Sequence, residues 1–587
     1  MAGLALVAVQ LGYRAWALAG SWFYFDDLAF MSRAMNQPFD LGYLTESYGG
    51  HLMPAGFAAA WVLTDRAVYD WWPWALTLLA MQAVAGVGML RLLLSMFGHR
   101  RLVLVLLAGY LGYVFTLPAG LWWAAGINQL PFQIALAFGL TSHLAYLRTG
   151  RVRHLVATLA WTVAGLAFYE KTLLLFGIYA IVALGWFCRG NTPERLLSLW
   201  ARYRPGIVAH TVVAATYLAL YVEYGLNFSP GDSSNQPWSP IAWNLVAVAL
   251  LPGLVGGPIT WEPLTVGSFA DPSQIVQLAS WALVGALVVY AYRTRTRSGR
   301  AWAPLLFTLL ANVALLASAR ANIVGPDIAR EYRYQTESGA LFVLCVGLAF
   351  LPLLGADEVN EARPEVPRPY ERQGVVVLLS LAVAAAALTS SDRYIELWQD
   401  RNPTEAYISS VRSSLAAAED KPVPLVDTGI PQTLLWAFRY PENAYSHVLR
   451  PFADETTYPR HAVDRLYMFD DAGHLAPVVV PPTRQMVPGT GCGYPLKGRR
   501  TVIPLDGPVI GGGWWIQIGY ASRRALSLRV TAGDDVHDLD LPAGLHNVFV
   551  QASGEFQEVT VSGYPRSSDA CVAELALGVP VPVAATS

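Results

Sequence analysis

The sequence predicts a polytopic α-helical membrane protein that ends in a polar, strand-rich domain. Hydrophobic residues make up 54% of the 587-residue chain and charged residues only 14%, against about 25% in typical soluble domains. The mean hydropathy is +0.37. Charged residues are spread unevenly, with 44 in residues 1–390 and 38 in the much shorter stretch 391–587. We therefore expect a membrane body in residues 1–390 and a polar tail after it.

The same composition excludes several classes of protein. A soluble enzyme, a disordered chain and a disulfide-dense mini-protein all need more charge or more cysteine than this chain contains. The net charge is -2, from 40 basic and 42 acidic residues. Because no block of basic residues forms a phosphate-tracking patch, we expect no nucleic-acid partner.

Eleven apolar runs are long enough to cross the roughly 30 Å hydrocarbon core of a bilayer. They lie near residues 1–20, 72–96, 102–119, 129–147, 155–169, 173–187, 206–222, 274–292, 302–319, 336–354 and 374–390. Two of them, 155–169 and 173–187, are short and can also be one bent segment. The first run lacks a basic flank and a small-residue cleavage site, so we interpret it as a spanning helix rather than a signal peptide.

The basic residues predict the orientation of these helices. With the N-terminus in the cytoplasm, 16 arginines fall in the inner connections and 6 basic residues fall in the outer ones, which is the bias of the positive-inside rule. We therefore expect a multi-pass plasma-membrane protein with an extracytoplasmic tail. The outer face then carries the first loop 21–71, a loop of about fifty residues at 223–273 and a polar loop at 320–335.

The tail is expected to contain two parts. Residues 391–486 predict a helix leaving the membrane and an extracytoplasmic α/β connector. In residues 487–587, strand-like runs alternate with turn clusters every 8 to 12 residues or so, the spacing of a β-sandwich or jelly roll. Extracytoplasmic surroundings favour a disulfide between Cys492 and Cys571.

Three aromatic residues of this sandwich are candidates for sugar binding. An extracellular sandwich often serves as a carbohydrate-binding module, and Trp514, Trp515 and Tyr520 could then stack on sugar rings. The alternative is that aromatics alternating along a strand belong to its core.

Adjacent carboxylates, Asp26 and Asp27, follow the first predicted helix at the outer membrane boundary. A carboxylate in a partly desolvated pocket can have a raised pKa and can accept a proton from a hydroxyl nucleophile. The competing interpretation is that both residues cap the following helix at its positive N-terminal end.

Two further polar clusters are predicted on the outer face. His51 follows Gly49 and Gly50 in the first outer loop, where it could bind a phosphate or orient Asp27, or could simply face water at the interface. Glu170 and Lys171 lie in a tight turn between two short helices. That turn is either a solvated hairpin tip or part of an outer-face cleft.

A cluster of arginines stands against the positive-inside trend. Arg320, Arg330, Arg333 and Tyr334 fall in the outer loop 320–335. Guanidinium groups bind phosphate in a bidentate manner, which suits the anionic group of a lipid-linked substrate. Local ion pairs with Asp327, Glu331 or Glu337 are the competing account.

Together these features resemble the GT-C superfamily of polytopic glycosyltransferases, with actinobacterial cell-envelope mannosyl- and arabinofuranosyltransferases the nearest in kind. The features are an Asp pair directly after the first transmembrane helix, a long first outer loop, about eleven helices and an outer C-terminal domain. The topology match covers the whole chain, whereas the residue match consists of Asp26 and Asp27 and, more weakly, of Arg330, Arg333 and Tyr334.

The resemblance implies transfer of a sugar from a polyprenyl-monophosphate donor to an outer-face cell-envelope glycan, lipid or protein acceptor. Asp26 or Asp27 would be the general base, with a slight preference for Asp27. Arg320, Arg330, Arg333 and Tyr334 would bind the donor phosphate, and His51, Glu170 and Lys171 would support donor or acceptor. Some members use a divalent cation, but the sequence shows no compact ligand set near Asp27, so we expect no metal or other cofactor.

Two other classes of protein compete with this interpretation. A transporter or flippase of a lipid-linked glycan would need paired repeats and ionisable residues near the bilayer midplane. No repeat is visible, and Arg14 and Arg91 are the main charges within the predicted spans. A membrane-anchored glycan-binding protein would need only one helix.

Overall fold

The computed structural model describes residues 1–225, 237–264, 267–364, 366–368, 371–419 and 421–583. The chain forms two compact units, Met1–Asn402 and Pro403–Ser587. The expected end of the membrane body at residue 390 falls inside helix α18 (Gln373–Asp400), which continues to the end of the first unit. The first unit is helical, and the second is rich in strands.

Seven helical stretches in the described part of the chain are long and apolar enough to span a membrane, as expected of a multi-pass membrane protein. They are α1 (Ala2–Ala19), α5 (Trp71–Phe97), α8 (Trp123–Thr149), α11 (Thr192–Tyr224), α14 (Gln274–Thr294), the stretch Ser298–Ser318 around α15 (Ala303–Leu315), and Gln373–Ala417, which contains α18. The bent pair α6 (Arg101–Gly112) and Val114–Leu121 makes an eighth if it counts as one span.

The predicted number of eleven spans is not confirmed. Each predicted run coincides with a helix, but α9 (Val152–Leu166), α10 (Leu174–Trp186) and α17 (Glu337–Phe350) have only 15, 13 and 14 residues. At 1.5 Å per residue, 15 residues cover roughly 22 Å, which is less than the hydrocarbon core. An apolar helical stretch, Trp238–Leu254, lies inside the predicted outer loop 223–273 and was not predicted; residues 226–236 of that loop lie outside the described residues.

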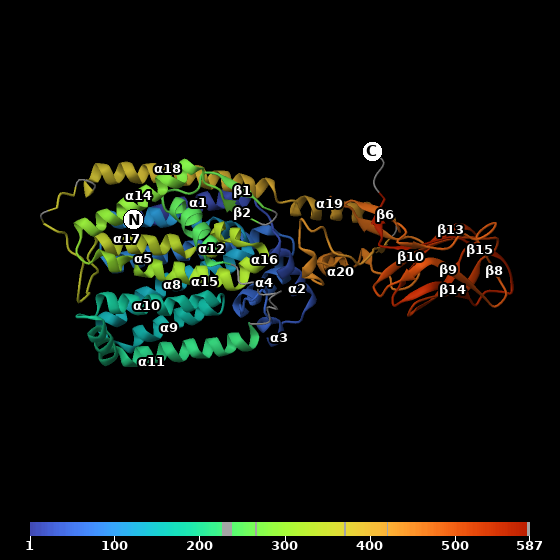
Figure 1. The fold of residues 1–587 in the computed structure, drawn as a ribbon, viewed down its shortest axis with the longest axis horizontal. Coiled ribbons are helices and arrows are strands. Elements are labelled where there is room, and N and C mark those ends of the chain that lie inside the picture. Colours follow the sequence, from blue (N-terminus) through green and yellow to red (C-terminus); the bar gives the residue numbers. More distant parts are fainter. Residues whose placement is uncertain (226–236, 265–266, 365, 369–370, 420, 584–587) are drawn as a thin grey trace. The chain divides into compact units, whose positions relative to one another are not determined.

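Helix α8 occupies the interior of the first unit. Of the spans, it has the largest buried share, and it packs against both α5 and α9. In Figure 1, α11 runs along one edge of the helical body and α18 along the opposite edge. The polar residues Asn128, Gln129 and Gln133 of α8 are therefore buried among helices rather than exposed to lipid.

Local sequence signals fix several helix ends. Asp70 accepts a hydrogen bond from the backbone of Trp72 at the start of α5. Asn191 and Glu194 form a reciprocal capping box at the start of α11, which satisfies two otherwise unpaired N–H groups. At the other end of a helix, Gly150 follows α8 in the left-handed conformation that glycine adopts without strain.

The first outer connection folds into a small helical cap. It contains α2 (Asp26–Asn36), α3 (Leu41–Thr45) and α4 (Pro54–Ala67). Phe30 of α2 packs edge-on against Phe57 of α4, Trp123 of α8 and Tyr48, with ring centroids 5.7, 6.3 and 4.8 Å away. This aromatic core attaches the connection to the start of α8.

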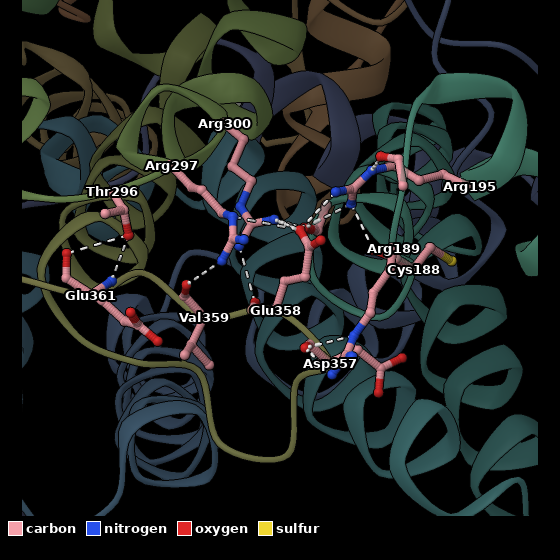
Figure 2. Close-up of polar contacts among 12 residues, drawn as sticks. Cys188, Arg189, Arg195, Thr296, Arg297, Arg300, Asp357, Glu358, Val359 and Glu361 are labelled. Carbon is pink, nitrogen blue, oxygen red and sulfur yellow. Dashed lines mark hydrogen bonds and ion pairs between the residues drawn. The ribbon is translucent and has the colours of Figure 1, made fainter.

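Arginine–carboxylate contacts join the loops that the charge bias predicts to be cytoplasmic. The Glu358 carboxylate lies 2.6 Å from Arg195 Nη2 and 2.9 Å from Arg300 Nη1 (Figure 2). The Asp357 carboxylate lies 2.6 Å from Arg202. The backbone carbonyl of Asp357 accepts two hydrogen bonds from the Arg189 guanidinium. The connection between α17 and α18 is thereby joined to the N-terminal part of α11 and to the turn before α15.

The second unit contains a short connector and a two-sheet sandwich. One sheet has the order β13 (Gly544–Ala552), β10 (Trp514–Ser522), β15 (Ser567–Gly578) and β7 (Arg484–Gln485), with β8 (Tyr494–Lys497) also paired to β15. The other has the order β12 (Asp535–Leu541), β11 (Leu526–Ala532), β14 (Phe556–Ser562) and β9 (Arg500–Val509). Their inward-facing residues, such as Ile503, Ile516 and Val559, share one apolar core.

Most of the connector precedes this sandwich in the sequence, but its strand β16 follows the sandwich. It contains α19 (Thr404–Ala417), α20 (Tyr445–Val448), the parallel pair β3 (Val423–Pro424) and β4 (Thr456–Thr457), and the three-stranded sheet of β16 (Val581–Pro582), β6 (Leu475–Val479) and β5 (Tyr467–Phe469). Cys492 and Cys571 form a disulfide with Cα atoms 6.4 Å apart.

The proposed sugar-stacking role does not hold for two of the three aromatics. Tyr520 is 2% exposed within the sandwich core, and Trp515 is 7% exposed beside Val426 and Phe549. A buried ring cannot stack on a sugar from outside. Trp514 is partly exposed, but its Nε1 donates to the carbonyl of Ile510 and its ring packs against the core.

Candidate functional site

The polar clusters predicted on the outer face lie together in the first unit. His51 Nδ1 lies 2.8 Å from Glu170 Oε1. Lys171 Nζ donates to the carbonyl of Tyr334 over 2.8 Å. These contacts bring the first outer loop, the turn after α9 and the arginine-rich loop to one place. The sequence places these segments more than a hundred residues apart, so the structure alone shows that they meet.

Asp27 is wholly buried and both of its carboxylate oxygens are used. Oδ2 accepts from the backbone N–H of Tyr24 over 3.0 Å, and Oδ1 accepts from that of Ala124 over 2.7 Å. Ala124 lies in the first turn of α8, where a negative group is favoured. Burial raises the pKa of Asp27 well above its ordinary value, against the lowering by these two N–H groups. Asp27 therefore does not cap α2, the helix that it belongs to, but binds the first turn of α8 and fastens the turn before α2 to that helix.

Asp26 is placed differently from its neighbour. It begins α2, is partly exposed, and its Oδ1 accepts a 2.6 Å hydrogen bond from the Tyr48 hydroxyl. Its charge also acts on the Glu331–Arg333 pair. A base must be reachable by the hydroxyl that it deprotonates. Of the two carboxylates, Asp26 is the one that a hydroxyl group can reach from outside.

A tight turn joins Asp26 to the His51 cluster. Tyr48 and His51 exchange two backbone hydrogen bonds across Gly49 and Gly50, which have φ values of 58° and 84°. Only glycine adopts such values freely. The Gly49 carbonyl accepts from Arg320, and the Gly50 carbonyl accepts from the Tyr221 hydroxyl.

His51 links a cation to an anion. Its Nε2 lies 2.8 Å from Arg320 Nη2 and its Nδ1 lies 2.8 Å from Glu170 Oε1. Because a guanidinium can only donate, Nε2 must accept and Nδ1 must carry the proton that goes to Glu170. The imidazole is therefore held as its neutral Nδ1–H tautomer.

The partly exposed Arg333 and the buried Glu331 form an ion pair on which the charge of Asp26 acts. Arg333 Nε lies 2.8 Å from Glu331 Oε1, and the guanidinium packs over the rings of Trp122 and Tyr334 at 4.8 and 4.9 Å. Burial raises the pKa of Glu331 to about 7, although Arg333 lowers it. The pKa of Arg333 is above its ordinary value because the neighbouring carboxylates outweigh the lowering effect of burial.

The other predicted cations are engaged in pairs of their own. Arg330 Nη2 lies 2.7 Å from Glu262 and its guanidinium packs over Phe269, which matches the local ion-pair alternative. Lys171 Nζ lies 2.7 Å from the buried Glu337 carboxylate. Of the predicted cations, Arg320 and Arg333 are thus the two whose contacts connect them to Asp26 or to the turn that bears Tyr48.

Sequence reasoning missed four contributors to this site. Tyr48 binds Asp26, Trp122 packs under Arg333, and Gln129 donates to the Arg333 carbonyl over 2.8 Å. The backbone carbonyl of Tyr24 accepts a hydrogen bond from Trp122 Nε1. Tyr48 could have been suspected from the sequence only because it lies three residues before His51. Nothing in the local sequence distinguishes Trp122 or Gln129. Within the described residues, no group of three or more His, Cys, Asp or Glu side chains could hold a metal ion.

Comparisons with known proteins give a limited result. No family model and no curated protein matches the chain. Among solved structures, the chain is similar to the arabinofuranosyltransferase AftD from Mycobacteria at 13% identity and a TM-score of 0.34, over 98% of this chain and 58% of that chain. A mutant form of that enzyme matches at 11% identity and a TM-score of 0.33, over 98% and 61%.

The enzyme in both matched structures is an arabinofuranosyltransferase. This chain spans about three fifths of the length of the AftD chains that it matches.

Proposed function

We propose that this protein is a membrane glycosyltransferase. It moves a sugar from a polyprenyl-phosphate donor to a hydroxyl group of a cell-envelope glycan, lipid or protein acceptor, with Asp26 as the general base. One observation carries the proposal. In a multi-pass membrane unit, Asp26 is a partly exposed carboxylate that is held by Tyr48, and its charge acts on the Arg333–Glu331 pair.

Each part of this arrangement suits one need of the reaction. The acceptor hydroxyl gives its proton to Asp26 as its oxygen bonds to the anomeric carbon of the sugar. The bond from that carbon to the phosphate oxygen breaks, and the lipid phosphate leaves with an additional negative charge. Arg333 and Arg320 are the cations that stabilise this charge. The Tyr48 hydrogen bond holds the Asp26 carboxylate in place.

The donor class follows from the surroundings of the site. A phosphate carried on a long apolar chain reaches the head of the helical body from within the bilayer. Arg333 is 19% exposed at its side chain and lies on aromatic rings, so it offers a fixed guanidinium to such a group. His51 supports the site indirectly, because it holds Arg320 and Glu170 in place through its two ring nitrogens.

Sugar transfer by the purified protein tests this proposal. A panel of radiolabelled polyprenyl-phosphate sugars is offered to the wild type, to Asp26→Asn and to Asp65→Asn. Removing the base should lower the rate by about 10²- to 10⁴-fold. Asp65 is a matched control, because it is an exposed carboxylate of the same outer connection and pairs only with the neighbouring exposed Arg66 among its ion-pair contacts. If no donor is consumed while a lipid-linked glycan still binds, the transporter or anchor interpretation replaces this one.

A further inference from the structure

A cluster of arginines lies at the end of the helical unit that is remote from the candidate site. Helix α11 and the span Ser298–Ser318 both begin in this cluster. Near the other ends of the same two helices, Tyr221 and Arg320 donate to carbonyl groups of the Gly49–Gly50 turn. A helix that crosses the hydrocarbon core joins opposite membrane surfaces. The cluster therefore lies at the membrane surface opposite the candidate site.

Positive charge exceeds negative charge in this region. The segments 188–204, 293–300 and 355–372 contain eleven arginines, six acidic residues and no lysine. The guanidinium groups of Arg195, Arg297 and Arg300 share one carboxylate oxygen of Glu358, at 2.6, 3.9 and 2.9 Å (Figure 2). One carboxylate neutralises only one of three cations, so the cluster keeps a net positive charge.

Two arginines of the cluster are open to a further anion. The side chains of Arg297 and Arg202 are 52% and 49% exposed, whereas those of Arg195 and Arg300 are 21% and 18% exposed. Arg202 uses Nη1 for its hydrogen bonds to Asp357 and to the Phe187 carbonyl. Because a guanidinium carries five N–H donors in a fork that fits phosphate oxygens, Arg202 can bind a phosphate group as well.

The first turns of α11 add an apolar surface to the cluster. Leu196, Leu197 and Trp200 are 51%, 71% and 53% exposed. Since successive helical residues lie 100° apart, this apolar face is centred opposite to the face of Arg195 and Arg202. The non-helical backbone of Tyr203 separates residues 192–202 from the rest of α11. A helical segment with a basic face and an apolar face that contains Trp is typical of the membrane interface.

We propose that this arginine cluster binds the phosphate group of an anionic phospholipid. Arg202 and Arg297 donate to phosphate oxygens, and the acyl chains lie against Leu196, Leu197 and Trp200. The excess of positive charge attracts an anion, and the exposed apolar residues favour an anion that carries hydrocarbon chains over free phosphate. The site is separate from the proposed transfer site and does not depend on that reaction.

The bound lipid has a structural effect on the helical unit. Arg202 directly precedes the break at Tyr203 in α11, and Arg297 directly precedes the span Ser298–Ser318. Phospholipid bound at both arginines therefore stabilises the segments from which these two spans start. Because the lipid binds the folded protein, it should raise the melting temperature.

Thermal unfolding in mixed micelles tests the proposal. The purified protein in a neutral detergent is titrated with phosphatidylglycerol, with phosphatidylcholine or with soluble glycerol 1-phosphate. Phosphatidylglycerol should raise the melting temperature saturably, by about 2 °C or more, and the other two compounds should leave it unchanged. The double variant Arg202→Gln/Arg297→Gln should lose most of this rise.

A second double variant, Arg100→Gln/Arg101→Gln, is the matched control. It removes the same charge from another loop, in which both arginines are exposed and Arg101 donates to the neutral Gln373 side chain. This control should keep the full rise with phosphatidylglycerol. An equal loss in both double variants would show a general effect of basic charge and would overturn the proposal.

Other results would also overturn the proposal. A wild-type melting temperature that phosphatidylglycerol does not change would exclude the site, and an equal rise with phosphatidylcholine would show a general lipid effect. An equal rise with glycerol 1-phosphate would identify free phosphate, rather than a lipid, as the ligand. If Arg202→Gln/Arg297→Gln does not fold, Arg297→Gln alone takes its place. An unchanged phosphatidylglycerol midpoint in that variant would then count against the site.

Discussion

At the scale of single residues, Asp26 and Asp27 show how neighbouring carboxylates acquire different roles. Successive residues of a helix point about 100° apart, so at the start of α2 only one of them can face the interior. Asp27 faces inward to the N-terminus of α8, and Asp26 stays at the edge with Tyr48. The sequence could predict the pair and its two candidate roles. It could not assign them, because the partners Ala124 and Tyr48 are set by tertiary packing.

Asp27→Asn is expected to reduce stability rather than chemistry. The substitution keeps one oxygen of the carboxylate and replaces the other by an NH₂ group. That NH₂ group would then face the backbone N–H of Tyr24 or of Ala124, and two donors cannot bind each other. Leaving a buried donor unsatisfied costs about 1–3 kcal/mol. Denaturant or thermal unfolding of the purified variant measures this loss. An unchanged stability would show that the carboxylate does not fasten α2 to α8.

Glu331 should make donor binding depend on pH. Burial raises its pKa to about 7, so it becomes largely neutral below that pH and no longer competes with a phosphate for Arg333. Donor affinity should therefore strengthen, by roughly tenfold, as the pH falls from about 8 to about 6. Over the range from its ordinary pKa of 4.5 to 7, the same group lowers the stability of the fold as the pH rises.

The Michaelis constant for the donor, measured across this pH range, checks the prediction. The donor is a phosphodiester and does not itself titrate here. Glu331→Gln should bind donor with an affinity that no longer varies with pH. A pH profile that is the same in the variant and the wild type would exclude Glu331 as the titrating group.

At the scale of elements, hydropathy located the helices better than it located their ends. All eleven predicted runs contain helices, because a long apolar run in this composition has no other stable conformation in a bilayer. The lengths differed, since hydropathy does not detect breaks such as the non-helical Tyr203 inside α11 or the π-helical turn η5 (Leu316–Arg320) that ends at Arg320. Trp238–Leu254 was missed because Pro240 and Pro252 bound an apolar run, residues 241–251, that is too short to span a bilayer.

The ion pairs of Glu358 with Arg195 and Arg300 should contribute measurably to the stability of the helical unit. The Glu358 side chain is 13% exposed and contacts Arg195 and Arg300 (Figure 2), and these arginines lower its pKa against the effect of burial. Glu358→Gln should cost about 1–3 kcal/mol. The neighbouring Glu361→Gln is the control, because Glu361 contacts Thr296 through its backbone. Equal melting temperatures for both variants would contradict this role.

At the scale of the whole molecule, composition predicted a membrane body and a polar tail, and the structure divides the chain into two units. The charge bias predicts that the second unit is outside the cell. Composition could not predict that the clusters of the outer face meet, since Asp26, Glu170 and Arg333 converge only through packing around α8. It also could not predict that Trp515 and Tyr520 face the interior, because alternation along a strand suits a core and a binding face equally.

Protease accessibility tests the predicted orientation. Protease added to intact spheroplasts should remove the unit Pro403–Ser587 and leave the helical unit in the membrane, because the unit is expected on the extracytoplasmic side. Permeabilised spheroplasts serve as the control, since protease then reaches both faces. A C-terminal unit that is cleaved only after permeabilisation would reverse the orientation and would place the candidate site on the cytoplasmic face.

The central claim is that Asp26, and not Asp27, is the catalytic base. The most direct test is the single-turnover rate of sugar transfer by Asp26→Asn and Asp27→Asn, each normalised to its folded fraction. We expect a loss of about 10²- to 10⁴-fold for Asp26→Asn and a rate close to that of the wild type for the folded fraction of Asp27→Asn. A full rate in Asp26→Asn, with the loss confined to Asp27→Asn, would contradict the account.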